Sequence, residues 1–181
     1  MPQKPEKEPS DEVDRNQLQM ARTEGEAYHS SATYMMTSVA NTGDVTRVGD
    51  YYVGFAQEEA EGMWELRDEG EFEFVEPDEE NCHVEIVVTD GADKRFVPHL
   101  DVTVTLEGEG ETVGPVETPF LWHPGVHHYG ANVELPGDGT YDLHVEIAPP
   151  TFKRHDETNG NRYGETVETT FEGVEIETGQ D

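Results

Sequence analysis

The chain has 181 residues, with 41 Asp and Glu against 11 Lys and Arg, and its formal net charge is -30. This length suits one domain with a sizeable core and is too short for two comfortable ones. The charge argues against nucleic acid or an anionic membrane surface as a partner, because both are polyanions.

The acidic residues are spread along the chain rather than gathered in one tail. Such a surface repels itself strongly unless salt screens it, and near molar salt the Debye length is about 3 Å. We therefore hypothesise that the protein comes from a halophilic organism. Its thermal stability should then fall as salt is lowered. No apolar run approaches the roughly 18 residues of a transmembrane helix, and the first residues lack the apolar core of a signal peptide.

Residues 1–30 are polar and offer few apolar side chains to a core. Prolines stand among Lys and Glu in the first dozen residues, a composition typical of a disordered tail or tether. A weak helix over residues 11–28 is the alternative, and Gly25 disfavours it. We therefore predict a polar, largely disordered tail over residues 1–30 and one domain over residues 31–181.

From about residue 32 onward the sequence is typical of β-strands. Apolar and polar residues alternate, as they do when one face of a strand is buried. The expected strands include residues 50–56, 72–74, 83–89, 100–106, 141–147 and 167–176. About seven or eight short strands separated by Gly, Pro and Asp turns predict an all-β fold, an immunoglobulin-like antiparallel β-sandwich.

His83 and Glu85 are the first candidate metal ligands. Residues two apart in a strand point to the same face, so this imidazole and carboxylate project together. A solvent-facing pair on an acidic protein is the plainer interpretation when these two are taken alone. Cys82, the only cysteine, should be a core thiol on the other face, which argues against a blue-copper centre because that centre needs a thiolate.

Three of the eight histidines lie within six residues, at His123, His127 and His128. The turn at Pro124-Gly125 can fold this segment back on itself, and neutral imidazoles are common ligands of transition metals. Adjacent residues of an extended chain cannot aim at one point, so at most two of the three should bind one ion. His155 lies on a long irregular connection and signifies nothing by itself.

Residues 127–132, His-His-Tyr-Gly-Ala-Asn, are followed by a strand that ends in Pro-Pro at positions 149 and 150. This segment resembles the Pro-His-Tyr-Gly-Ala-Asn hallmark of the periplasmic iron-transport proteins of the P19/Tp34 family. His83-Val84-Glu85 and residues 96–106 are similar to strands upstream of that hallmark. The resemblance extends over roughly residues 45–175.

The resemblance implies an immunoglobulin-like sandwich, usually a homodimer, that binds copper and a second divalent metal outside the cytoplasm. It also implies a role in iron uptake through a membrane permease. The family's copper-binding histidines and nearby carboxylate fall on His83, His128, His155 and Glu85. Its methionine ligand falls on Leu121, which cannot bind a metal. If the chain is extended there, position 123 shares the face of position 121, so we hypothesise that His123 replaces the thioether.

Exchanging a thioether for an imidazole would lower any preference for Cu(I) and suit Cu(II), Zn(II) or Fe(II). The resemblance makes copper the expected ion, with iron or another divalent transition metal as alternatives. A hard-oxygen site for iron at Glu58, Glu59 and Glu61, beside Met63, is a further alternative. On a chain this acidic these residues are more simply explained as solvated surface.

The resemblance thus implies a metal-binding protein at the extracytoplasmic face of the cell membrane, with a membrane iron permease as partner. It has no Gly-x-Ser-x-Gly, phosphate-binding loop or His-Glu-x-x-His, so we expect no enzymatic activity. Two alternatives stay open. One is a metal-dependent oxidoreductase acting on iron, and the other is a cell-surface adhesion-type sandwich without a metal role.

Overall fold

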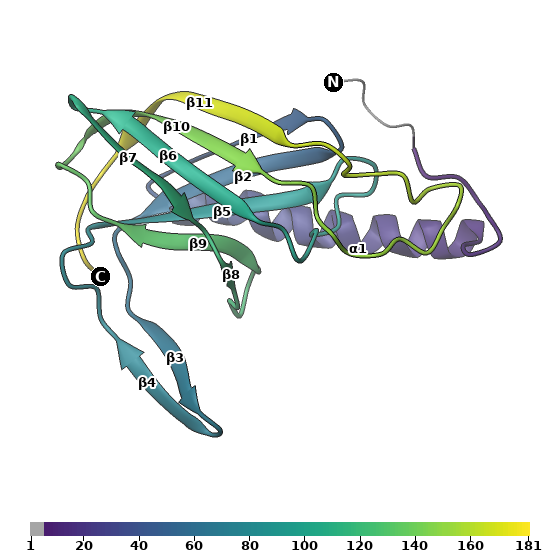
Figure 1. Ribbon diagram of the computed structural model, residues 1–181, viewed down its shortest axis with the longest axis horizontal. Coiled ribbons are helices and arrows are strands. Elements are labelled where there is room, and N and C mark those ends of the chain that lie inside the picture. The colour runs from purple at the N-terminus through teal and green to yellow at the C-terminus, as the bar shows by residue number, and fades with distance from the viewer. Residues whose placement is uncertain (1–5) are drawn as a thin grey trace.

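The computed structural model describes residues 6–181 and contains two antiparallel sheets that face each other (Figure 1). The five-stranded sheet consists, in order, of β1 (Thr42–Val48), β2 (Tyr51–Glu58), β5 (Cys82–Asp90), β9 (His128–Val133) and β8 (Phe120–Leu121). The four-stranded sheet consists, in order, of β11 (Val167–Ile176), β10 (Gly139–Ile147), β6 (Val102–Gly108) and β7 (Glu111–Glu117). A hairpin of β3 (Met63–Asp68) and β4 (Glu71–Val75) projects from this body. The predicted immunoglobulin-like antiparallel sandwich is confirmed.

The core lies between the two sheets and follows from the alternation of apolar residues. Val104 and Leu106 of β6 pair with Val145 and Leu143 of β10, and all four side chains are buried. Across the sandwich they share one apolar cluster with side chains of β2 and β5, including Phe55. Burial of each such side chain contributes about 1.5–3 kcal/mol relative to exposure, so this cluster is the main support of the sandwich.

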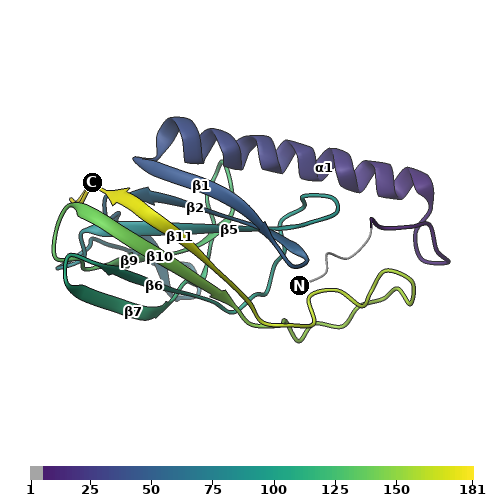
Figure 2. The ribbon, with the colours of Figure 1, turned by 90° about the horizontal axis from the view of Figure 1, so that it is seen from above.

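The polar N-terminal segment is folded from residue 15 onward. Helix α1 (Arg15–Tyr34) continues into a π-helical turn, η1 (Met35–Val39), and Figure 2 shows the helix lying along the five-stranded sheet. The Asp14 side chain accepts a hydrogen bond from the Gln17 backbone, and the Gln17 side chain accepts one from the Asp14 backbone. This capping box satisfies helix-terminal N–H groups and fixes the start of the helix. The prediction of disorder over residues 1–30 is therefore wrong from residue 15 onward.

Packing explains why this helix forms despite its polar composition. Ala32 and Met35 are buried in a second apolar cluster, against Val87 of β5. Gly25, which disfavours the helix by propensity, is buried against the loop after β5, where an added Cβ would lie 1.7 Å from the Asp93 carbonyl oxygen. The glycine therefore permits a close approach between helix and loop.

The residues before the helix are also tied to the sandwich. The Lys7 ammonium lies 2.7 Å from a carboxylate oxygen of Asp93 and 3.1 Å from one of Asp90, and both of these acids are buried. Residues 1–5, the start of the predicted tail, lie outside the described part of the chain. Within residues 6–181, no helix has the length and apolar character needed to cross a membrane.

Strand β5 is buried along its whole length. One face of β5, which carries Val84 and Ile86, is covered by the core. The other face is covered by the segment of α1 and η1, which packs against Val87. His83 and Glu85 share this second face because they alternate with the core residues. Their exposed fractions are only 1% and 4%, so the solvent-facing interpretation of the pair does not hold.

Candidate metal centre

Three buried side chains converge on the helix-covered side of the five-stranded sheet: His83 and Glu85 of β5, and His128 of β9. Each offers one ligand atom, and these atoms lie within 4.8 Å of one another. The Glu85 Oε1 atom is 3.1 Å from Nε2 of His128 and 3.9 Å from Nε2 of His83. The antiparallel pairing sets this geometry, because it places Glu85 opposite Gly130, two residues along β9 from His128. Residues two apart in a strand point to the same face, so His128 projects from the same face of the sheet as Glu85 and His83.

The hydrogen bond made by His128 determines which of its ring nitrogens is free. Its Nδ1 atom lies 3.0 Å from the carbonyl oxygen of Val126. A carbonyl can only accept, so Nδ1 carries the hydrogen and, in the neutral ring, Nε2 keeps its lone pair. This lone pair faces Oε1 of Glu85, another acceptor, at 3.1 Å. The contact therefore requires one proton between the two atoms.

His83 is oriented in the same way by Asn132 of β9. Its Nδ1 atom lies 2.9 Å from Oδ1 of Asn132, whose amide nitrogen donates to the Glu61 carbonyl at 2.8 Å. The amide oxygen is thus the acceptor, Nδ1 of His83 is the donor, and Nε2 is left with a lone pair. Metal-binding histidines commonly have their second nitrogen held in this manner. Both imidazoles therefore present a lone pair beside the Glu85 carboxyl group.

Burial shifts the protonation of all three groups toward their neutral forms. It raises the pKa of Glu85 to about 8, to which the charges of Glu58 and Glu61 contribute. It lowers the pKa of His128 to about 4 and also lowers the pKa of His83. The second oxygen of Glu85, Oε2, has no hydrogen-bond partner within residues 6–181. Two lone pairs and an unsatisfied buried carboxyl group fit a bound cation.

A cavity of about 500 Å³ lies between this group and the helix. The helical segment contributes Ser30, Ser31, Tyr34, Met35 and Val39 to its lining. The sheet side contributes Glu85 together with Glu58 and Glu61. Burial raises the pKa of Glu58 to about 6, and a hydrogen bond with Glu61 adds to this shift. Two members of the predicted oxygen-rich alternative thus lie beside the centre, whereas Glu59 is not part of this lining.

His123 lies at the edge of the cavity in an orientation that does not suit ligation. Strand β8 ends at Leu121, and the chain then turns instead of staying extended. The His123 Nδ1 atom accepts hydrogen bonds from the backbone N–H groups of Gly125, at 2.9 Å, and Val126, at 3.1 Å. In the neutral ring the hydrogen is then on Nε2, so neither nitrogen offers a free lone pair. The structure therefore places the His123 ring beside that of His128, with the ring centroids 5.9 Å apart, but leaves it no free nitrogen for the group. The extended geometry on which the hypothesis rested is absent.

Leu121 occupies the place beside the imidazoles instead. An added Cβ on Gly130 would lie 2.9 Å from Cδ1 of Leu121 and 3.2 Å from Nε2 of His83. Gly130 therefore lets the Leu121 side chain approach the centre across the β8 and β9 pair. This relationship depends on packing between strands, so periodicity within one strand could not reveal it.

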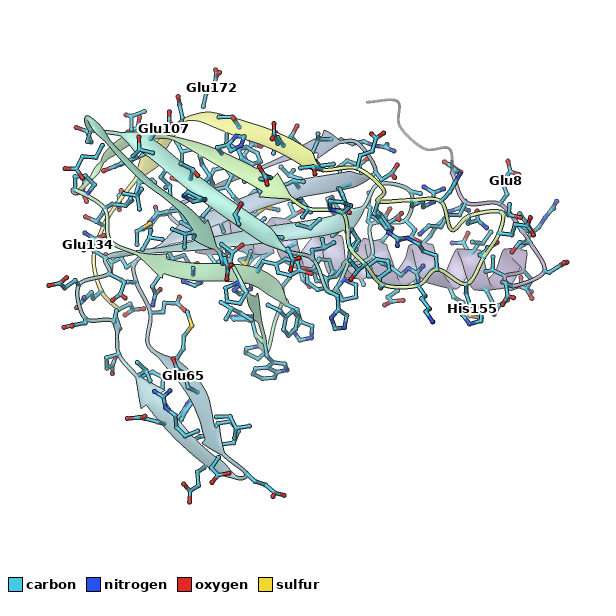
Figure 3. The ribbon with its side chains drawn as sticks, viewed as in Figure 1. Glu8, Glu65, Glu107, Glu134, His155 and Glu172 are labelled. Atoms are coloured by element: carbon cyan, nitrogen blue, oxygen red, sulfur yellow. The ribbon has the colours of Figure 1, made fainter. Side chains whose placement is uncertain are left out.

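His155 is distant from the other predicted ligands. Its side chain is 93% exposed, and its Nδ1 atom lies 3.4 Å from a carboxylate oxygen of Glu12. Figure 3 places it near the start of α1, away from strands β8 and β9. Within one chain, His155 therefore does not join His83, Glu85 and His128. His127 is exposed, as expected for a residue that does not ligate, and its carbonyl oxygen accepts a hydrogen bond from the Tyr28 hydroxyl group.

The fold and this group of ligands define the class of the protein as a β-sandwich with a buried candidate metal centre. The family model described as Fe2+ transport protein matches residues 65–175, and the chain belongs to this family. The predicted resemblance to periplasmic iron-transport proteins is thereby confirmed. No curated protein matches the sequence significantly.

Several solved structures share the fold. FetP from uropathogenic Escherichia coli strain F11 is 18% identical, with a TM-score of 0.59 over 74% of this chain and 93% of FetP. Copper-reconstituted P19 from Campylobacter jejuni is 16% identical, with a TM-score of 0.60 over 76% of this chain and 96% of P19. A copper-bound variant of P19 is 18% identical, with a TM-score of 0.61 over 75% and 96%. At these identities the likeness is one of fold.

Proposed function

We propose that this protein binds copper at His83, Glu85 and His128 and assists iron uptake at the extracytoplasmic face of the cell membrane. The observation that carries the proposal is the 3.1 Å contact between Glu85 Oε1 and His128 Nε2, two acceptors that share one proton. A metal ion is the natural replacement for that proton, because it binds both lone pairs at once. Copper in structures of FetP and P19 supports this choice of ion.

The donor set consists of two imidazole nitrogens and a carboxylate. Nitrogen and oxygen donors suit Cu(II), Zn(II) and Fe(II), and among these the Irving–Williams order favours Cu(II) in solution. Leu121 supplies no sulfur, so preference for Cu(I) should be weak. Glu58 and Glu61 line the adjoining cavity, where their oxygens would suit a harder ion such as Fe(II). The iron would be cargo, passed on to a membrane permease.

The position of His155 supports a homodimer. The family resemblance assigns this residue a role in copper binding, yet its side chain is 93% exposed and far from the group in its own chain. The exposed loop would allow His155 of one protomer to reach the centre of its partner. Mixing the His155→Ala and His128→Ala variants tests this arrangement, because only their heterodimer contains one complete centre. Restored copper affinity in the mixture is expected, and no restoration would contradict the arrangement.

The proposed role is that of a binder without catalytic turnover. The test is a Cu(II) titration of protein purified without a His tag, beside an assay of iron oxidation and reduction. We expect one tightly bound Cu(II) at this centre in each chain, loss of this binding in His128→Ala, and retention in the neighbouring control His127→Ala. Undiminished binding in His128→Ala would contradict the copper site. Many turnovers of iron per protein would favour the oxidoreductase instead.

A further inference from the structure

A second group of potential metal ligands lies on the outer face of the four-stranded sheet. His144 and Glu146 of β10 and Glu168 of β11 each offer a donor atom, and these atoms lie within 4.8 Å of one another. The alternating residues Val145 and Ile147 are buried in the core, so His144 and Glu146 point away from it. The first centre lies on the other sheet, and the two groups are therefore separate.

The strand register brings like charges together at this second group. Glu146 pairs directly with Glu168, and like charges in such a position destabilise a sheet. The sequences of β6, β7, β10 and β11 contain no Lys or Arg. Within residues 6–181, the ion pairs of lysine and arginine are made with other carboxylates and do not include Glu146 or Glu168. No lysine or arginine in the described part of the chain offsets this repulsion, and a bound cation would relieve it.

His144 is held in an orientation that suits ligation. Its Nδ1 atom lies 3.0 Å from the hydroxyl oxygen of Thr170, the residue that pairs with His144 on β11. A hydroxyl oxygen can accept the Nδ1 hydrogen, and Nε2 then keeps its lone pair for a metal ion. Holding one ring nitrogen in this way is how proteins usually orient a histidine ligand. The imidazole therefore distinguishes this group from a simple cluster of acidic residues.

We propose that His144, Glu146 and Glu168 bind a divalent first-row transition-metal ion such as Zn2+. One imidazole and two carboxylates are a donor set that Zn2+ accepts, with water completing its coordination. Ca2+ and Mg2+ prefer oxygen ligands alone, so the histidine biases the site away from them. Both carboxylates are exposed, so the ion exchanges with solvent without opening the fold. This proposal does not depend on the copper centre.

The test is a Zn2+ titration by calorimetry in a background that lacks the first centre, His83→Ala with His128→Ala. About 1 M NaCl should be present, because it shortens the Debye length to about 3 Å and suppresses diffuse binding. One Zn2+ per chain is expected. In this background His144→Ala should abolish binding, and Thr170→Val should weaken it by about tenfold or more.

The matched control is Glu107→Gln, which removes one carboxylate elsewhere from the four-stranded sheet (Figure 3). Glu168→Gln should weaken Zn2+ binding and Glu107→Gln should not. Equal losses in these two variants would indicate only a diffuse ion atmosphere and overturn the proposal, as would undiminished binding in His144→Ala. If the background variant does not fold, the otherwise native chain is compared with His144→Ala. An unchanged Zn2+ stoichiometry in that comparison would overturn the proposal as well.

Discussion

Glu85 and His128 meet across neighbouring strands, with Oε1 of one 3.1 Å from Nε2 of the other. The Nδ1 atom of His128 is engaged by the Val126 carbonyl group, so its Nε2 brings no hydrogen of its own to this contact in the neutral ring. One proton must therefore lie between the carboxylate and the imidazole. Any metal ion that binds both atoms must displace it.

Copper binding should therefore release a proton near neutral pH. Burial raises the pKa of Glu85 to about 8, whereas the pKa of His128 is lowered to about 4. At pH 7 the imidazole is neutral and the released proton comes from Glu85. Calorimetric titration in buffers of different ionisation enthalpy should give about one proton per Cu(II). Glu85→Gln should release almost none, and an equal release from both proteins would exclude Glu85 as the source.

The same shifts predict how the stability of the metal-free protein depends on pH. The folded pKa of Glu85, about 8, exceeds its unfolded value of about 4.5, so between these pH values the folded state binds more protons. This contribution lowers the free energy of unfolding as pH rises. The lowered pKa of His128 acts in the opposite direction between about 4 and 6.5, because there the unfolded state binds more protons.

Above pH 6.5 His128 no longer contributes to the pH dependence of the free energy of unfolding, whereas Glu85 still does. The free energy of unfolding should therefore fall between pH 6.5 and 8, by at most about 1.4 kcal/mol per pH unit. Urea unfolding of the metal-free protein measures this dependence. Glu85→Gln should remove most of the decline, and a decline of the same size in that variant would assign it to other groups.

Leu121→Met should restore a soft ligand beside the imidazoles. Leu121 Cδ1 lies 2.9 Å from the position of an added Cβ on Gly130, which would itself be 3.2 Å from Nε2 of His83. A thioether there would favour Cu(I), and we expect its affinity to rise by about tenfold, or 1.4 kcal/mol. Competition with a Cu(I) chelator measures the change. The buried control Leu135→Met should leave the Cu(I) affinity unchanged. Equal gains in affinity in both variants would contradict the placement of Leu121.

Gly25→Ala should destabilise the protein although alanine is the better helix former. Propensity alone would add about 1 kcal/mol of stability. The new Cβ would, however, lie 1.7 Å from the Asp93 carbonyl oxygen, so the helix must move away from the loop. We expect the free energy of unfolding to fall by about 1–3 kcal/mol. The exposed control Gln19→Ala should be neutral or slightly stabilising, and a more stable Gly25→Ala protein would disprove the close approach.

Much of the fold could be predicted because apolar and polar residues alternate along the strands, and this alternation is visible in the sequence. Leu143, Val145 and Ile147 alternate with polar residues, and this pattern is enough to place β10 in a sandwich. The same period predicted that His83 and Glu85 share a face. Helix α1 was foreseen only as a weak alternative over residues 11–28, because its composition is polar and its stability comes from tertiary packing of residues such as Ala32. The Asp14 and Gln17 capping box was the available signal.

The remaining parts of the centre depend on contacts that no local pattern encodes. The assignment of His123 assumed an extended chain, whereas backbone N–H groups within the turn occupy its Nδ1 atom. The cavity wall formed by Met35 and its neighbours could not be foreseen, because the sequence from about residue 32 is typical of strands and no helix was expected there. In the second group, on the four-stranded sheet, the pairing of Glu146 with Glu168 could likewise be known only from the register between β10 and β11.

The anomalous scattering at the copper edge from a crystal soaked in Cu(II) would show directly whether copper occupies His83, Glu85 and His128. A peak is expected between β5 and β9, about 2.0–2.2 Å from the Nε2 atoms of His83 and His128 and within reach of Glu85. A peak bonded to the Nδ1 atoms, or copper bound only elsewhere while these three residues hold none, would contradict copper binding at this centre.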